Sequence, residues 1–266
     1  MNLYTRLSTF KAASNVTDHI DDPMILQTLT AASRGFDGAL NRVIYPERAT
    51  RIFDAEGGEL LLLNSDVLSV QSLSADGSAL TEGTDYLLYP YNKRPASAVV
   101  RLGGKWPTGR AKVSITGVFG VADTTAPTGA TVGNETTLSG SGTELDLAVA
   151  ADVEAGDMLV IESEDIYVIA VSEEGEDETA KLVASVVRAC NGTTAAAHAN
   201  GTPIRRRTYP AGLEEACILQ TSRMLTGKAT GGANVVGDPD LGGFSFGALY
   251  PAIQDLLQPF RRYGVH

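Results

Sequence analysis

Cysteine, histidine and aromatic residues are all scarce in this 266-residue chain, which holds two cysteines, three histidines and 6% aromatic residues. Two cysteines do not make a disulfide framework, so a reducing compartment is the default expectation. Long apolar runs are lacking too. No stretch approaches the roughly 18 residues of a membrane helix, and the N-terminal MNLYTRLSTFKAA has no apolar signal-peptide core. We therefore expect neither a membrane span nor secretion, and synthesis in a cytoplasm.

Positive charge is also in deficit, since the formal net charge is -11 and the pI is about 4.7. This balance argues against a surface that binds duplex DNA by general attraction to phosphate. A partner held by charge should be basic, unless DNA is to be repelled. The chain does have a 43% hydrophobic fraction and 28 glycines, which indicate a folded, β-rich protein with many turns.

The clearest helical pattern lies in residues 21–43, DDPMILQTLTAASRGFDGALNRV. Its apolar residues recur at three- and four-residue steps, which places them on one helical face. They are Ile25, Leu26, Leu29, Ala32, Phe36, Leu40 and Val43. Asp22 is the predicted cap and Pro23 suits the first turn, while Tyr45 and Pro46 are predicted to end the helix.

Residues 50–121 change to short alternating runs separated by Gly, Asp and Asn, which is typical of strands and turns. RIFDAEGGELLLL predicts a hairpin around Glu56-Gly57-Gly58, and VLSVQSLSADGSAL predicts a turn at Asp76-Gly77. DYLLYP, SAVVRL and AKVSITGVFG predict further strands. The fold class expected is therefore α+β, with helices packed on a small, mostly antiparallel sheet.

The composition changes near residue 121, where VADTTAPTGATVGNETTLSGSGTE predicts a linker or a long loop. ELDLAVA, DMLVIES, DIYVIAVS and KLVASVVR then predict strands without helices between them, typical of a small barrel or sandwich. Lifting this segment out would leave a continuous α+β unit. The sequence therefore predicts a host domain of residues 1–123 and 209–266, interrupted by an inserted all-β module of residues 124–208.

The helical period returns after Pro210 in GLEEACILQTSRMLTGK, with Gly227 as the predicted end. The residues expected near its inner face are Leu213, Cys217, Leu219, Gln220 and Met224. Residues 227–247 are Gly-rich and predict a flexible tether. Residues 248–266 form an amphipathic segment whose apolar stripe is followed by two arginines, which suit a helix C-terminus. The residues of the apolar stripe are Ile253, Leu256, Leu257 and Phe260, and the two arginines are Arg261 and Arg262.

The stretch RACNGTTAAAHANGTPIRRRTYP, residues 188–210, gathers the side chains that look most like a reactive site. Cys190 and His198 lack the ligand spacing of zinc sites, so a turn-side histidine that hydrogen-bonds loop backbone is favoured over a metal ligand. Neither cysteine has the context of an activated thiolate, and no G-x-S-x-G elbow exists. Cys217 is expected to be a small core residue. We expect no catalytic residue, no metal and no cofactor.

Other charged features have plain interpretations. Lys105 in GGKW lacks the rest of a phosphate-binding loop and is expected to be a solvated turn lysine. An acidic run lacks the spacing of a calcium loop and is expected at a solvated hairpin tip. Its residues are Glu173, Glu174, Glu176, Asp177 and Glu178.

Arg205, Arg206 and Arg207 oppose the overall sign of the chain. Strand alternation would send Arg205 and Arg207 to one side and Arg206 to the other. Two interpretations stay open, an ion-pair network with an acidic neighbouring subunit and a solvated strand end. Nearby, Asn191-Gly192 and Asn200-Gly201 predict the turns that close the β module.

The order of the motifs resembles the head-tail adaptor proteins, also called connector or head completion proteins, of long-tailed double-stranded DNA bacteriophages. The resembling stretches are LYTRLSTFKAASNVTD, DDPMILQTLTAASRGFDGALNRVIYPERATRIFD, GELLLLNSDVLSVQSLSADG and TDYLLYP, over about residues 3 to 121. The resemblance resumes at YPAGLEEACILQTSRML and LYPAIQDLLQPFRRYG. VVRACNGTTAAAHANGTPI is similar to the endings of small β modules in virion and tail proteins, with Ala189-Cys190 where a single Gly is common.

The resemblance implies a structural virion protein at the capsid vertex, without enzymatic activity. It would form a ring of about a dozen copies docked beneath the portal, meet a stopper or tail terminator protein, and line the DNA channel. DNA would pass without sequence-specific binding, since carboxylates in the lumen do not hold phosphates. The C-terminal segment would dock into the portal through Tyr250, Ile253, Leu256, Leu257, Phe260, Arg261 and Arg262. If the ion-pair interpretation of Arg205, Arg206 and Arg207 holds, these residues would lie between the subunits of this ring.

Two alternatives compete with this interpretation. One is another structural virion role, as a stopper, tail terminator or decoration protein, which would favour the tail end over the portal. The other is a glycan-binding or hydrolytic virion module. It is disfavoured because residues 124–208 hold too few aromatic side chains for a sugar-stacking platform.

Overall fold

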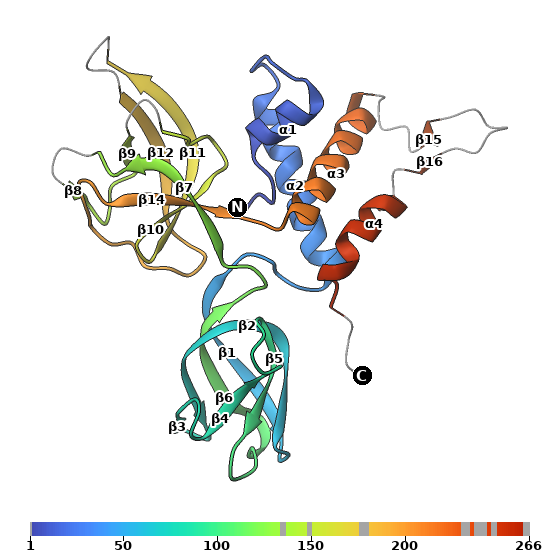
Figure 1. Ribbon diagram of the computed structural model, residues 1–266, viewed down its shortest axis with the longest axis vertical. Coiled ribbons are helices and arrows are strands. Elements are labelled where there is room, and N and C mark those ends of the chain that lie inside the picture. Colours follow the sequence, from blue (N-terminus) through green and yellow to red (C-terminus); the bar gives the residue numbers. More distant parts are fainter. Residues whose placement is uncertain are drawn as a thin grey trace. The chain divides into compact units, whose positions relative to one another are not determined.

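The computed structural model describes residues 2–133, 137–147, 151–175, 181–229, 235–236, 244–245 and 249–262. The chain divides into two compact units (Figure 1). Unit 1 comprises Met1–Asn41, Thr124–Cys190 and Thr194–His266, and unit 2 comprises Arg42–Asp123 and Asn191–Thr193. Helices occur with antiparallel sheets, so the predicted α+β class is confirmed. The predicted packing of the helices on the sheet of residues 50–121 is not shown, since the helices belong to unit 1 and pack on one another. Residues 124–190 group with the helices, and the predicted independence of the 124–208 module stays a prediction.

The helices of unit 1 come from segments far apart in the sequence. They are α1 (Leu7–Ser14), α2 (Asp22–Leu40), α3 (Ala211–Ala229) and α4 (Pro251–Leu257), with the 3-10 turn η2 (Gln258–Phe260) after α4. α2 packs against α3, α3 against α4, and α1 against both α2 and α3 (Figure 1). Each longer helix buries an inward stripe at helical spacing. The buried apolar residues are Leu7, Phe10, Ile25, Leu29, Ala32, Phe36, Leu40, Leu213, Ala216, Cys217, Ile253 and Leu257.

The start of α2 differs from the expected cap. Asp21 occupies the N-cap position, without a side-chain hydrogen bond to the first turn. Asp22 lies inside the first turn, where its carboxylate accepts a hydrogen bond from Lys11 Nζ at 2.6 Å and pairs with His19 Nδ1 at 2.7 Å. Asp22 therefore joins α2 to the end of α1, a helix that sequence reasoning did not predict.

The end of α2 comes earlier than predicted. The helix stops at Leu40 because Asn41 takes a left-handed conformation, with φ of 53°. Asn tolerates this conformation better than most residues and commonly ends helices in this way. The predicted end at Tyr45 and Pro46 is therefore wrong, and Val43 lies outside the helix.

Helix α3 confirms the helix predicted after Pro210, with two differences. It continues through Gly227 to Ala229 instead of ending at the glycine. Leu213 and Cys217 are buried as expected, but Leu219 is exposed. Two positions beyond Cys217 correspond to about 200° around a helix, so Leu219 faces away from the core.

The sheet of unit 1 is antiparallel, with strand order β7-β14-β10-β11-β12-β9. These strands are β7 (Thr124–Thr131), β9 (Glu144–Leu147), β10 (Met158–Ile161), β11 (Glu164–Glu174), β12 (Lys181–Cys190) and β14 (Pro203–Thr208). A second pairing joins β8 (Thr137–Leu138) to β13 (His198–Ala199). The end strands β7 and β9 do not pair in the described residues, so the sheet is open and a closed barrel is not shown.

The prediction of a linker or long loop after residue 121 is partly wrong, because this segment forms β7 and β8. Its Thr- and Gly-rich composition indicates weak packing, but β7 pairs with β14, and this pairing provides hydrogen-bond partners for its backbone. Thr128 is buried and its hydroxyl donates to the carbonyl of Ile204 at 2.8 Å, while Ala130 and Val132 enter the core. Long-range pairing therefore overrides the local composition.

Unit 2 is also an antiparallel sheet, with strand order β1-β6-β2-β5-β4. Its strands are β1 (Glu47–Glu56), β2 (Leu60–Ala75), β3 (Ser78–Leu80), β4 (Tyr86–Tyr89), β5 (Ala96–Arg101) and β6 (Thr108–Phe119), and β3 pairs with β2. The predicted turn at Asp76-Gly77 is confirmed, with φ of 50° and 81°. The predicted hairpin at Glu56-Gly57-Gly58 is wrong, because β6 lies between β1 and β2 and pairs with both.

The core of unit 2 lies on one face of this sheet. It includes Phe53, Leu73, Ile115 and Phe119, together with Trp106, whose indole N–H donates to the carbonyl of Glu59 at 2.9 Å. Neighbouring Lys105 is exposed, as its solvated interpretation predicted. The alternation of strand residues therefore fixes which face of the sheet is covered.

The segment predicted as a tether is described only in part. β15 (Val235–Val236) pairs with β16 (Phe244–Ser245), and most of the remaining residues of 227–247 lie outside the described residues. Across the described ranges, the search for a helix long and apolar enough to cross a membrane found none.

Candidate functional site

A buried ion pair lies at the centre of the 188–198 stretch. Glu164, at the start of β11, is fully buried, and Arg188 reaches it from the neighbouring strand β12. The guanidinium donates in a bidentate manner, from Nε to Oε1 at 2.8 Å and from Nη2 to Oε2 at 2.7 Å. Such fork-to-fork pairs are short and directional. The contact fixes both side chains inside the β module.

His198 belongs to the same cluster. It is buried on β13, with Nε2 at 2.9 Å from Glu164 Oε2 and Nδ1 at 2.8 Å from Glu162 Oε2. The predicted partner of this histidine, loop backbone, is therefore wrong, since both ring nitrogens face carboxylates. The carboxylates lie at the β10–β11 turn, more than thirty positions away in sequence, so local spacing gave no sign of them.

The backbone completes the cluster and shows its role. The N–H groups of Ala189 and Ala196 each donate to the Glu164 carboxylate at 3.0 Å. Arg188 in turn donates to the carbonyls of Ser139 at 2.7 Å and Ala196 at 2.6 Å. These bonds tie the two ends of the β12–β13 loop to one buried carboxylate. Among the described residues, no group of three acidic, His or Cys side chains is arranged to hold a metal ion.

The cluster shifts the pKa of Glu164. Burial alone would raise this pKa, but the Arg188 guanidinium, the two backbone N–H groups and His198 together lower it to about 2. The depressed pKa means that folding favours the ionised form, so Glu164 stabilises the fold above its unfolded pKa near 4.5. That stabilisation is lost as the pH falls from about 4.5 toward 2.

We expect this loss to reach roughly 3 kcal/mol between pH 5 and pH 2, at 1.36 kcal/mol per pKa unit. The measurement is the free energy of unfolding in urea across that range, compared with Glu164→Gln. The variant is less stable at pH 6, but its curve should lack this acid-dependent component. Parallel curves for the two proteins would contradict the assignment.

The cysteines are not activated as nucleophiles. Cys217 is buried in α3, its Sγ lies 3.6 Å from Ser33 Oγ, and burial raises its pKa to about 11. Burial also raises the pKa of the half-buried Cys190, whose thiol contacts the carbonyl of Val187. The core role predicted for Cys217 is confirmed.

The three arginines of β14 each have partners within the chain. Arg207 forms a bidentate pair with buried Asp165, with Nη2 to Oδ1 at 2.7 Å. Arg206 Nη1 lies 3.1 Å from Asp152 Oδ2. Arg205 is exposed and donates to the hydroxyl and carbonyl of Thr125. A contact of these arginines with a neighbouring subunit stays a prediction, and Arg205 is the most accessible of the three.

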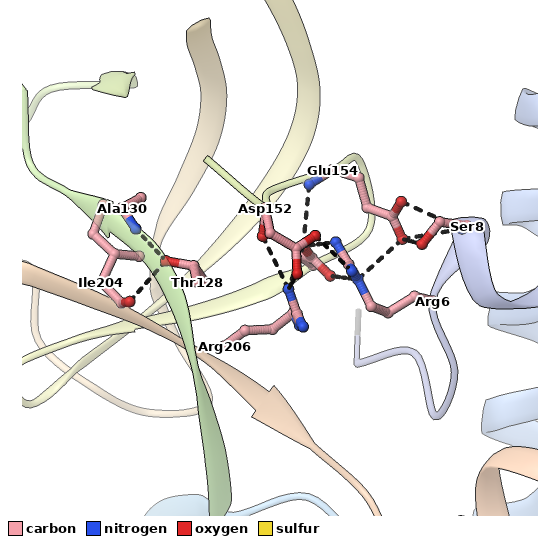
Figure 2. A network of polar contacts seen from close by, with 9 residues as sticks. Arg6, Ser8, Thr128, Ala130, Asp152, Glu154, Ile204 and Arg206 are labelled. Atoms are coloured by element: carbon pink, nitrogen blue, oxygen red, sulfur yellow. Dashed lines mark hydrogen bonds and ion pairs between the residues drawn. The ribbon is translucent and has the colours of Figure 1, made fainter. Parts of the chain in front are cut away.

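Figure 2 shows that the carboxylate of Asp152 contacts both Arg206 of β14 and Arg6 of the N-terminal segment. Arg6, just before α1, binds Asp152 Oδ1 at 2.8 Å and both oxygens of buried Asp157 at 3.1 Å. The backbone N–H of Ser8 adds a hydrogen bond to Glu154. Burial raises the pKa of Asp157 although Arg6 acts in the opposite direction.

Apolar packing accompanies this polar network. The turn before β10 contains Gly156, with φ of 94°, and a Cβ there would lie 2.6 Å from Leu3 Cδ1 and 3.0 Å from Leu26 Cδ2. The left-handed φ favours glycine here, and an added Cβ would make the side chains of Leu3 and Leu26 shift. The β module and the N-terminal segment are therefore closely packed within unit 1.

The residues predicted for portal docking do not form one free stripe. Ile253 and Leu257 are buried inside unit 1, where α4 packs on α3. The backbone N–H of Arg262 donates to the carbonyl of Leu40 at 3.1 Å. Tyr250 and Arg261 are exposed, whereas Leu256 and Phe260 are half-buried. A groove of about 570 Å³ lies beside this segment, lined by Ala39, Leu40, Leu249, Gln254, Asp255, Leu257, Gln258 and Arg261.

Sequence reasoning missed an exposed apolar face on unit 2. Leu60 and Leu62 of β2 and Tyr89 of β4 are about half exposed. The signal was the unbroken run LLLL at residues 60–63, because a strand with one wet face should alternate. In the acidic run, Glu173 and Glu174 are exposed as predicted, while Glu176, Asp177 and Glu178 lie outside the described residues.

Comparisons with known proteins do not assign this chain to a family. No family model matches the chain, and no curated protein matches its sequence. A solved structure described as the neck of an empty GTA particle computed with C6 symmetry is similar over 99% of this chain and 92% of its own. The two chains are 12% identical and superpose with a TM-score of 0.41, a likeness too low to support a functional argument.

Proposed function

We propose that this chain is a structural virion protein that forms a ring between portal and tail, joins the capsid vertex to the tail, and surrounds the DNA channel. The order of the sequence motifs supports this role. The structural observation that carries the proposal is the distribution of charge between the two units.

The net charge belongs to unit 1. Unit 2 contains nine basic and nine acidic residues, whereas unit 1 contains twelve basic and twenty-three acidic residues. Many arginines of unit 1 are already paired with carboxylates, including Arg6, Arg188 and Arg207. The excess carboxylates give unit 1 a negative field that repels phosphate, which allows duplex DNA to slide past without being held.

Packing inside unit 1 limits which residues of the C-terminal segment we propose for the portal contact. Burial of Ile253 and Leu257 stabilises unit 1 itself, so deleting residues 248–266 would damage the fold as well as any docking. We propose the portal contact at two exposed side chains that flank α4, Tyr250 before the helix and Arg261 after it. Exposed aromatic and arginine side chains are frequent anchors at protein interfaces.

The test mixes the purified chain with the portal protein of its own virion and counts bound copies by negative-stain electron microscopy and gradient sedimentation. We expect a ring on the wild-type portal and at least about tenfold weaker binding for Tyr250→Ala/Arg261→Ala, since loss of an interface anchor costs more than about 1 kcal/mol. Ile20→Ser, an exposed site before α2, is the control. Binding to the tail end instead of the portal would contradict the proposal and favour a stopper or terminator.

A further inference from the structure

An apolar strip crosses three strands of unit 2 on the face opposite its core. Leu60 and Leu62 of β2 are 50% and 54% exposed, and Tyr89 of β4 is 45% exposed. The strand register aligns Leu62, Ala98 and Tyr89 in one row. The next row on the same face joins Leu60 to Val100 and Leu87. Ala98 is buried between Leu62 and Tyr89 in its row, and Leu87 and Val100 are half-buried, so Leu60, Leu62 and Tyr89 supply the exposed part of the strip.

The strip extends into the loop that follows β4. Tyr91 is half exposed and stacks edge-on against Tyr89, with ring centroids 5.3 Å apart. Lys93 and Arg94 follow and are both exposed. A contiguous apolar patch with a polar rim is typical of a protein interaction surface, whereas isolated exposed leucines are ordinary.

The two edges of this sheet are β4 and β1. On β1, Ile52 is 65% exposed, and its register partner is Ser114 of β6, while neighbouring Phe53 points into the core. Ile52 therefore lies on the outer face at the edge opposite Tyr89. Open strand edges and exposed apolar side chains both favour pairing with another chain.

The net charges of the two units favour a second copy of this chain as the partner of this apolar face. Copies of this chain that met through unit 1 would bring together two units whose net charge is -11 each, from twelve basic and twenty-three acidic residues, and like charges repel. Unit 2 is neutral, so its apolar faces can meet without that repulsion. A contact between two different edges is head-to-tail, and repeated around a closed circle it makes a ring.

We infer that the outer face of unit 2 at Leu60, Leu62 and Tyr89 binds the β1 edge around Ile52 of a second copy of this chain. This inference rests on the proposed ring and names the surfaces that would form it. Neighbouring copies then associate through their neutral units, and the acidic units remain free of the contact.

The first experiment compares self-association of Leu62→Ser/Tyr89→Ser with the wild-type chain by mass photometry over a concentration series. Both side chains are exposed, so circular dichroism should show an intact fold. We expect the dissociation constant for assembly to rise at least tenfold. Ile169→Ser, an equally exposed apolar site on β11 of unit 1, is the matched control and should assemble like wild type.

The second experiment tests which faces meet. Chains with Ile52→Cys and chains with Leu62→Cys are oxidised separately and as a mixture, with wild type as the background for Cys190 and Cys217. Disulfide-linked dimers should appear chiefly in the mixture. Assembly without this cross-link, or association that stops at two copies, would overturn the head-to-tail contact.

The outcomes separate this inference from the proposed function. A Leu62→Ser/Tyr89→Ser variant that assembles as well as wild type overturns the interface and leaves the ring in place. If wild type stays monomeric alone, the same variants are compared by counting copies bound to the portal. A wild-type chain that neither assembles alone nor accumulates on the portal overturns both proposals.

Discussion

Arg188→Met is expected to lower the free energy of unfolding of unit 1 by about 3–5 kcal/mol. The substitution removes the guanidinium that faces Glu164 and leaves the fully buried carboxylate facing His198 and the backbone N–H groups of Ala189 and Ala196. It also releases the carbonyls of Ser139 and Ala196. Breaking one side of a buried ion pair costs far more than breaking a surface pair, because the remaining charge stays desolvated.

The measurement is urea unfolding of the full chain, followed by circular dichroism. Arg205→Met is the control. Arg205 lies in the same sheet, but its side chain is exposed and donates to the hydroxyl and carbonyl of Thr125 instead of to a buried carboxylate. We expect it to cost less than about 1 kcal/mol. Adding Glu164→Gln to Arg188→Met should recover part of the loss, since it removes the unpaired charge. Equal losses for the two arginine variants would refute the structural role of the cluster.

Gly192→Ala is expected to destabilise unit 2 by about 3 kcal/mol or more. Asn191 and Gly192 both have positive φ, at 52° and 72°, as the turn requires. A Cβ on Gly192 would lie 2.0 Å from the carbonyl oxygen of Arg48, and this is backbone that cannot rotate away. The turn would have to move, at the expense of the 2.8 Å hydrogen bond from Arg48 N–H to Asn191. Strained backbone and a lost bond each cost about 1–2 kcal/mol.

Gly77→Ala supplies the matched control for this prediction. Gly77 follows Asp76 in the same kind of turn, with φ of 81°, but has nothing within 4 Å of an added Cβ. Its substitution should cost only the positive-φ strain, about 1–2 kcal/mol. Calorimetric melting of both variants separates conformational strain from steric overlap. If the two glycine variants melt together, the close approach at Arg48 is not a constraint.

Local periodicity predicted the elements that depend on neighbouring residues. The apolar stripe of α2 and the strands β10, β11 and β12 follow from spacing alone, because one face of each is buried. Turn chemistry at Asp76-Gly77 was equally local. Errors began where a single residue decides a boundary, as at Asn41, whose left-handed conformation ends α2 early.

Local sequence patterns could not predict which strands pair when they are far apart in the chain. Nothing local indicates that β6 pairs with both β1 and β2, or that a Thr- and Gly-rich segment becomes β7 once β14 lies beside it. The partners of His198 and Arg6 are also distant in sequence, so their carboxylates could not be assigned. Residue types at 188–198 correctly marked an unusual stretch, but only the fold shows that its chemistry serves stability.

The pairing of β7 with β14 has a consequence for how this gene could have changed. Thr124 and Thr208 are register partners, and the Thr124 hydroxyl donates to the Thr208 carbonyl at 2.7 Å. The segment between them therefore starts and finishes at adjacent points. Gaining or losing this segment in one genetic event would leave the flanking chain ends adjacent, as a change in loop length does. Losing it would also leave Arg6 and Leu3 without the partners that the segment now supplies.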